Sequence, residues 1–153
     1  MLQHAAEAAP VSEAPGHGRD RCDVADSIAN QLVVALDIDE TITRHPSFFA
    51  FLSHALTAAG HRVLVITFRI DRAAAEADLR SWGIAYDDLF TPSVDPDSDD
   101  GTDEWKGRLC EEHRVDVLFD DSPEVLRFVG PGVLSLMVVD QARYDLSRLC
   151  KRV

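Results

Sequence analysis

Short apolar runs that end in polar or acidic residues recur along this chain, and they limit its fold more than any other feature. Such runs occupy 32–38 (LVVALDI), 62–68 (RVLVITF), 115–121 (VDVLFDD) and 133–140 (VLSLMVVD), with a weaker strand or turn at 84–90. Continuous apolar runs of this length are typical of strands buried on both faces, as in a parallel sheet. We therefore expect a central, mostly parallel sheet.

The segments between these runs have helical spacing and helix-end signals. Pro46 suits the first turn of a helix, Asp71 suits an N-cap, and Gly60 and Gly83 suit helix ends. The expected helices cover 46–60, 73–82, 105–113, 122–130 and 143–151. Alternating strands and helices predict a Rossmann-like three-layer α/β/α sandwich with right-handed crossovers.

The 153 residues match the length of about one domain. Residues 1–30 are rich in Ala, Pro, Gly and charge, which predicts a flexible N-terminal tail with a short helix near 23–30. Residues 31–153 are then expected to form a single domain.

Composition restricts the partners of the chain. The formal net charge of -12 disfavours non-specific binding to nucleic acid or anionic membranes, without excluding a local basic site. No apolar run is long enough to cross a membrane, and the first residues lack a basic start with an apolar core. We expect a cytoplasmic protein with its three cysteines reduced.

Polar side chains follow the apolar runs where the strands of the expected sheet end. Asp37 and Asp39 lie at the end of the first run, Thr67 at the end of the second and Asp120–Asp121 at the end of the third, while Lys106 lies in the expected helix before the third run. Carboxylates two residues apart on an extended segment face the same side and repel, so they need a cation, a shared proton or a large separation in pKa. Mg²⁺ prefers oxygen ligands, and a cation, a hydroxyl and an ammonium together suit a phosphate group.

These segments, in this order, resemble the motifs of the haloacid dehalogenase-like (HAD) phosphohydrolase superfamily. The matching segments are VVALDIDET, VLVIT, the lysine of EWKGRL, and VLFDD, which together span 33–121. Only 42–45 separate the first motif from the next expected helix, and the other insertion point holds the acidic segment 91–104. The resemblance therefore implies a HAD-like fold without a cap domain.

The resemblance also implies roles for the motif residues. Asp37 would be the nucleophile that forms an aspartyl-phosphate, and Asp39 the general acid and then the general base. Asp37, the backbone carbonyl of Asp39, Asp120 and Asp121 would hold Mg²⁺. Thr67 would bind a phosphoryl oxygen, and Lys106 would stabilise the charge of Asp37 and the transferring group.

The predicted function is therefore hydrolysis of a phosphomonoester on a small molecule or a macromolecule, in an unspecified oligomeric state. Two alternatives stay open: a HAD-like binding or regulatory module with weak catalysis, and a phosphotransferase with the same intermediate.

The roles of several residues have more than one interpretation. Arg69 contacts substrate or simply opens the next helix, and Arg44 and His45 line the entrance or form a solvated flap. The segment 91–104 is expected to be a surface loop, because the alternating acids at its centre depart from a calcium loop at the sixth and twelfth positions.

Overall fold

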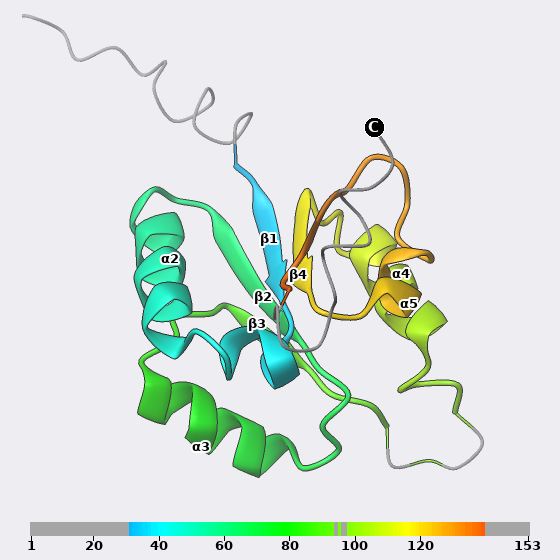
Figure 1. Cartoon of the computed structure of the whole chain (residues 1–153), viewed down its shortest axis with the longest axis horizontal. Helices are drawn as coiled ribbons and strands as arrows, with labels where there is room; N and C mark the ends of the chain where they lie inside the picture. Colours follow the sequence, from blue (N-terminus) through cyan, green and yellow to red (C-terminus); the bar gives the residue numbers. More distant parts are fainter. Residues whose placement is uncertain (1–30, 94, 96–97, 140–153) are drawn as a thin grey trace, which may run out of the picture.

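Parallel strands form the centre of the molecule in the order β3-β2-β1-β4-β5 (Figure 1). The structure, a computed structural model, describes residues 31–93, 95 and 98–139. The strands are β1 (Val33–Leu36), β2 (Arg62–Ile66), β3 (Asp88–Phe90), β4 (Val117–Asp120) and β5 (Leu134–Met137). The expected tail 1–30 and the expected helix 143–151 lie outside the described residues.

Helices cover both faces of this sheet. They are α2 (Pro46–Ala58), α3 (Arg72–Trp82), α4 (Asp103–Glu112) and α5 (Pro123–Leu126), together with the one-turn segment η1 (Ile38–Ile42) after β1. Figure 1 places α2 and α3 on one side of the sheet and α4 and α5 on the other. The predicted three-layer, Rossmann-like α/β arrangement is confirmed.

The apolar runs are buried on both faces because their side chains alternate between two cores. Val63 and Val65 of β2 pack into the core with α2 and α3, whereas Leu64 and Ile66 pack into the core with α4 and α5. All four side chains have 0% exposure. A central strand of a covered parallel sheet requires this pattern.

The predicted helix-end signals at α3 are confirmed. Asp71 caps α3 by accepting a hydrogen bond from the backbone N–H of Ala74. Gly83 ends the helix with φ +71°, a left-handed conformation that glycine adopts without steric cost.

The prediction of a helix over 122–130 is wrong in length. Ser122 caps α5 and Pro123 begins it as expected, but the helix ends at Leu126. The backbone N–H of Phe128 then donates to the carbonyl of Val125 in a tight turn. Phe128 in this turn lies directly against Gly107 of α4.

The strands are shorter than the apolar runs that predicted them. The run 32–38 becomes a strand only over Val33–Leu36, because the backbone turns into η1 after Asp37. The weak segment 84–90 forms the short strand β3, and the run 133–140 forms β5, with its last residue outside the described part of the chain. No helix among the described residues is long and apolar enough to span a membrane.

Candidate functional site

The candidate site lies at the carboxyl ends of β1 and β4, the two strands that neighbour each other at the centre of the sheet. From β1 the chain continues to β2 and β3 on one side of β1, and it then crosses to β4 and β5 on the other side. The order of the strands therefore reverses between β1 and β4. Ligands of open α/β sheets bind at such a reversal. A pocket of about 300 Å³ is present here, lined by Asp37, Asp39, Glu40, Phe68, Lys106, Asp120, Asp121 and Ser122.

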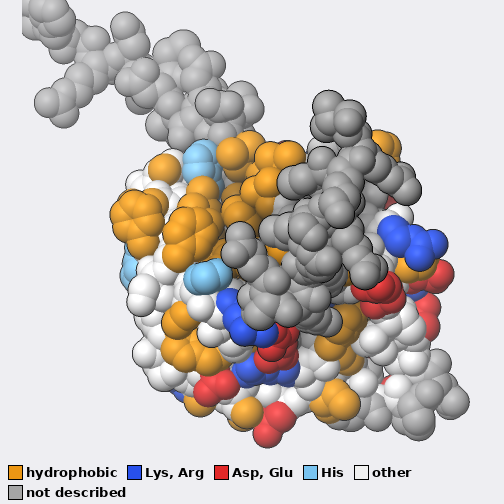
Figure 2. Space-filling view, viewed as in Figure 1, with side chains coloured by type: hydrophobic (Ala, Val, Ile, Leu, Met, Phe, Trp, Pro, Cys, Tyr) orange, Lys and Arg blue, Asp and Glu red, His pale blue; other side chains and the backbone are white. Residues whose placement is uncertain are grey.

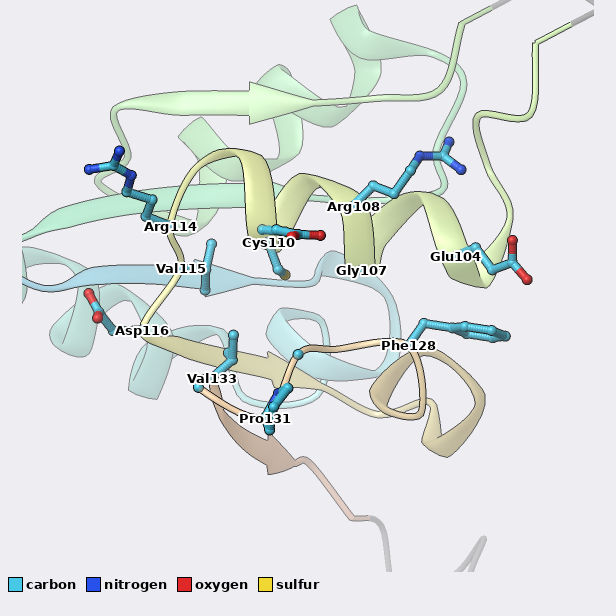
Figure 3. A pocket seen from close by; sticks show the side chains of 13 residues that line it. Glu104, Gly107, Arg108, Cys110, Arg114, Val115, Asp116, Phe128, Pro131 and Val133 are labelled. Atoms are coloured by element: carbon cyan, nitrogen blue, oxygen red, sulfur yellow. The ribbon is translucent and has the colours of Figure 1, made fainter.

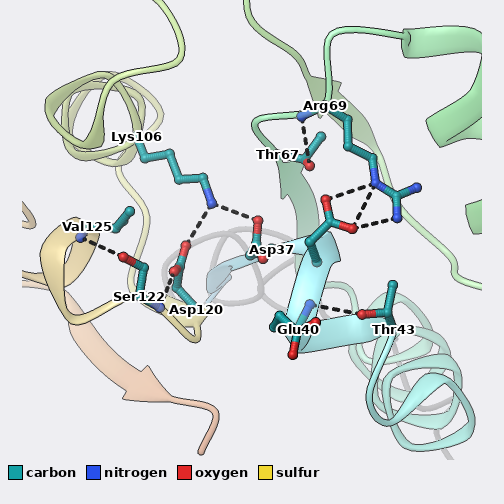
Figure 4. A network of polar contacts seen from close by, with 10 residues as sticks. Asp37, Glu40, Thr43, Thr67, Arg69, Lys106, Asp120, Ser122 and Val125 are labelled. Atoms are coloured by element: carbon teal, nitrogen blue, oxygen red, sulfur yellow. Dashed lines mark hydrogen bonds and ion pairs between the residues drawn. The ribbon is translucent and has the colours of Figure 1, made fainter. Parts of the chain in front are cut away.

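A buried ammonium lies between two buried carboxylates at the base of this pocket (Figure 4). Lys106 Nζ of α4 is 2.6 Å from Asp37 Oδ1 and 2.8 Å from Asp120 Oδ2. The three side chains are 2%, 6% and 1% exposed, respectively. The sequence motifs on β1, α4 and β4 therefore meet as predicted.

The charges in this cluster do not cancel. Burial raises the pKa of the Asp37 carboxyl to about 7, because the charge of Lys106 opposes the burial only in part and the charge of Asp120 adds to it. Burial also disfavours the Lys106 ammonium, but Asp37 and Asp120 outweigh it and raise the pKa of that group. With all three groups ionised, the cluster carries one more negative than positive charge in a poorly solvated place, and either a proton on Asp37 or a further cation relieves it.

Backbone contacts fix the two carboxylates. Asp120 Oδ1 accepts a hydrogen bond of 2.8 Å from the backbone N–H of Ser122, the residue that caps α5. The Asp37 backbone N–H donates to the carbonyl of Phe119 on β4. The Asp37 carboxylate, which accepts from Lys106 through Oδ1, lines the pocket.

Asp39 lines the same pocket but has a different partner. Its carboxylate is 55% exposed and accepts hydrogen bonds of 2.9 and 2.6 Å from Nε and Nη2 of Arg69. Arg69 also donates to Asp78 of α3 at 2.7 Å and does not line the pocket. Its use as a substrate contact stays a prediction.

Thr67 is placed at the end of β2 as expected, but its side chain is fully buried. Its hydroxyl oxygen accepts a hydrogen bond of 3.3 Å from the backbone N–H of Arg69, and it does not line the pocket. A direct bond to a phosphoryl oxygen remains a prediction. Arg44 forms an exposed ion pair with Glu40 and His45 precedes α2, and neither lines the pocket.

Carboxylate oxygens dominate the lining of the pocket where Mg²⁺ is predicted. No group of three or more His, Cys, Asp or Glu side chains within the described ranges converges closely enough to hold a metal ion. The chemistry of the lining nevertheless fits a hard cation, since it presents five carboxylates and one ammonium. Asp37 and Asp120 share Lys106 in this arrangement, and their carboxylates, with that of Asp121, would hold such a cation.

Sequence reasoning missed three residues that line the pocket. Phe68 places its ring 4.3 Å from Lys106 Nζ and closes one wall. Glu40, with φ +59°, and Ser122 complete the rim. Each is adjacent to a motif residue, which was the available signal.

A larger pocket of about 700 Å³ lies along α4 and shares no lining residue with the acidic pocket (Figure 3). Glu104 and Phe128 lie at one end, and Arg114 and Asp116 lie at the other. Cys110, a free and buried cysteine, lies between these ends. Its lining mixes apolar and charged side chains without paired buried carboxylates, so the acidic pocket is the better chemical site.

Two chains of known structure are similar to this chain in fold. No protein-family model matches the chain, and no curated protein matches it. A chain of the Pnkp1/Rnl/Hen1 RNA repair complex is similar with a TM-score of 0.56 and 19% identity, over 71% of this chain and 42% of that chain. A universal stress protein in complex with cAMP is similar with a TM-score of 0.44 and 13% identity, over 71% of this chain and 98% of that chain. The first likeness supports the α/β fold.

Proposed function

We propose that this chain is a Mg²⁺-dependent phosphomonoester hydrolase of the HAD type, with Asp37 as its nucleophile. The observation that carries the proposal is the buried Asp37–Lys106–Asp120 cluster beneath an acidic pocket at the carboxyl ends of β1 and β4. Burying two carboxylates and one ammonium is costly, and a structural ion pair does not need the second carboxylate. Perturbed carboxyl groups in a pocket are characteristic of catalytic sites.

The proposed reaction has two displacements. The Asp37 carboxylate attacks phosphorus, the bond from phosphorus to the ester oxygen breaks, and Asp39, protonated at that stage, gives its proton to the departing oxygen. Water then attacks the aspartyl-phosphate and gives a proton to Asp39. The bond between phosphorus and Asp37 breaks, which releases phosphate and restores both side chains.

The other lining groups stabilise charge during these steps. Lys106 is fixed 2.6 Å from Asp37 and balances charge that develops on the carboxylate and the phosphoryl group. Asp37, Asp120, Asp121 and the backbone carbonyl of Asp39 would hold Mg²⁺, which when bound neutralises repulsion between the nucleophile and an anionic substrate. Only residues 43–45 separate η1 from α2, so no inserted cap covers the site from that connection. This openness is compatible with a phosphate on a small molecule or on a macromolecule.

Hydrolysis of an aryl phosphate tests the proposal. Wild type, Asp37→Asn and the control Asp88→Asn are assayed with Mg²⁺ and with chelator. The control makes the same chemical change at an exposed carboxylate of β3 that pairs with Arg62. We expect metal-dependent turnover in wild type and the control and at least a ~1000-fold loss in Asp37→Asn, since removing a nucleophile abolishes its pathway. Equal activity of Asp37→Asn and wild type would exclude Asp37 as nucleophile.

The two alternatives give different results in companion assays. A binding module would show a rise in melting temperature with Mg²⁺ and beryllium fluoride, a phosphoryl mimic, but no turnover. A phosphotransferase would pass the phosphoryl group to an added alcohol in preference to water.

A further inference from the structure

Arg69 is held by three groups that lie outside the buried ion cluster. Its Nε and Nη2 bind the Asp39 carboxylate, and its Nη1 binds Asp78 Oδ2 at 2.7 Å. The guanidinium carbon lies 5.8 Å from the centre of the Trp82 ring, within the range of a cation–π contact. The Arg69 side chain is 23% exposed, so little of it is left for a ligand.

The two groups behind Arg69 come from one face of α3. Asp78 and Trp82 are four residues apart in a helix that spans Arg72–Trp82, so their side chains are neighbours on its surface. A carboxylate and an indole ring one turn apart thus hold the guanidinium with its other edge toward Asp39. Figure 4 shows that edge joined by dashed lines to a carboxylate.

Asp39 depends on Arg69 for its position. Its residue belongs to η1, where the backbone at Asp39 and Glu40 is not helical. Within the described residues, the hydrogen bonds of the Asp39 carboxylate all come from Arg69. A carboxylate that is 55% exposed and held only by these bonds would otherwise sample several rotamers at the pocket rim.

We infer that Arg69 is a positioning residue for Asp39, braced by Asp78 of α3, rather than a ligand of the substrate. This inference rests on the proposed function, because it concerns the group that protonates the leaving oxygen. A bidentate guanidinium fixes both the direction and the plane of a carboxylate, which a single ammonium donor cannot do. Proton transfer requires hydrogen-bond reach to the leaving oxygen, so misplacing Asp39 lowers the rate of that transfer.

The dependence of the rate on the leaving group separates this role from a general structural one. p-Nitrophenolate departs with little help from an acid, whereas an alkoxide must be protonated as it leaves. Wild type, Arg69→Gln, Arg69→Lys, Asp78→Asn, Asp39→Asn and the double variant Arg69→Gln/Asp39→Asn are assayed with p-nitrophenyl phosphate and with ethyl phosphate. Arg80→Gln is the control, because Arg80 is an exposed arginine near the end of the same helix.

We expect Arg69→Gln to lower kcat on ethyl phosphate by about 10- to 100-fold, with KM unchanged and at most a few-fold loss on p-nitrophenyl phosphate. Asp39→Asn should show the same selectivity more strongly, and the double variant should be no worse than Asp39→Asn alone. Asp78→Asn should give a smaller loss of the same kind, Arg69→Lys should not restore the rate fully, and Arg80→Gln should match wild type.

Three outcomes would overturn the inference. A rise in KM on both substrates without loss of kcat would make Arg69 a substrate ligand. Equal losses on both substrates together with a lower melting temperature would make its role purely structural. Wild type without turnover on either substrate would reject the proposed function and this inference with it, whereas an active wild type with the wrong Arg69 pattern rejects the inference alone.

Discussion

At the scale of single residues, the uneven charge of the buried cluster is the feature with most consequence. Asp37 and Asp120 both contact Lys106, so the three side chains carry one more negative than positive charge when all are ionised. A fold selected only for stability would avoid this, because an uncompensated buried charge is destabilising. Sites that bind and transform a charged ligand retain such groups.

The pH dependence of stability follows from the raised pKa of Asp37. The carboxyl has a pKa of about 7 in the folded chain against an ordinary 3.8, mainly because of burial. Its protonated form therefore favours folding below about pH 4, and this contribution is lost as the pH rises to about 7. In chelator, the free energy of unfolding of Asp37→Asn minus that of wild type should become more positive over this range.

Denaturant titrations of both proteins at several pH values measure that difference. Asp88→Asn serves as the control, because its exposed carboxylate lies on β3 away from the pocket. A difference for Asp37→Asn that stays constant with pH would contradict a raised pKa for Asp37.

At the scale of elements, the site depends on how closely α4 approaches the turn after α5. Lys106 reaches Asp37 and Asp120 from α4, and Gly107 follows it on the same helix. A Cβ built on Gly107 would lie 2.5 Å from the carbonyl oxygen of Phe128, so only glycine allows this approach. The close contact of α4 with this turn helps to hold the lysine in place.

Substitution of Gly107 tests that contact. Gly107→Ala should lower the free energy of unfolding by about 1–3 kcal/mol, since the backbone must shift to admit the methyl group. The control is Gly132→Ala, where the added Cβ meets nothing within 4 Å and φ is not positive. Denaturant unfolding measures both, and an unchanged stability of Gly107→Ala would show that the turn moves aside without cost.

At the scale of the whole molecule, the inner strands of the sheet are buried from solvent, whereas the edge strand β5 is partly exposed. β1 and β2 lie inside the sheet and place residues in both cores, whereas β5 is an edge strand with Leu134 57% and Met137 38% exposed. Phe48 and Phe51 of α2 are also 52% and 72% exposed, and hydrophobic side chains gather on that face in Figure 2. The acidic pocket borders the protected half of the sheet, at β1.

Amide hydrogen exchange should be slower in the buried inner strands than in the exposed edge strand β5. The backbone amides of β2 at Leu64–Ile66 are expected to exchange slowest, at free energies close to that of global unfolding, and those of β5 substantially faster. Exchange followed by mass spectrometry with peptide resolution measures both strands in one sample. Equal protection of β2 and β5 would show that the sheet opens as one unit.

The sequence alone predicted the layers of the fold and the meeting of the motifs. An apolar run that ends in acid defines both a buried strand and the residues at its carboxyl end, and parallel strands bring those ends to one edge. Asp37, Lys106 and Asp120 therefore converge as expected, although they are far apart along the chain. Local signals also predicted Asp71 and Gly83 at the ends of α3.

Tertiary structure decided the partners of individual side chains and the ends of short elements. Because the backbone turns into η1, Asp39 forms an ion pair with Arg69, whereas Asp37 forms one with Lys106, although the two acids are only two residues apart. The packing of Phe128 against Gly107 accompanies the early end of α5, and Thr67 is buried rather than exposed to the pocket. The local sequence pattern indicates periodicity and helix or strand propensity. The partners of side chains and the ends of short elements depend instead on backbone turns and on residues distant in sequence, which only the assembled fold brings into contact.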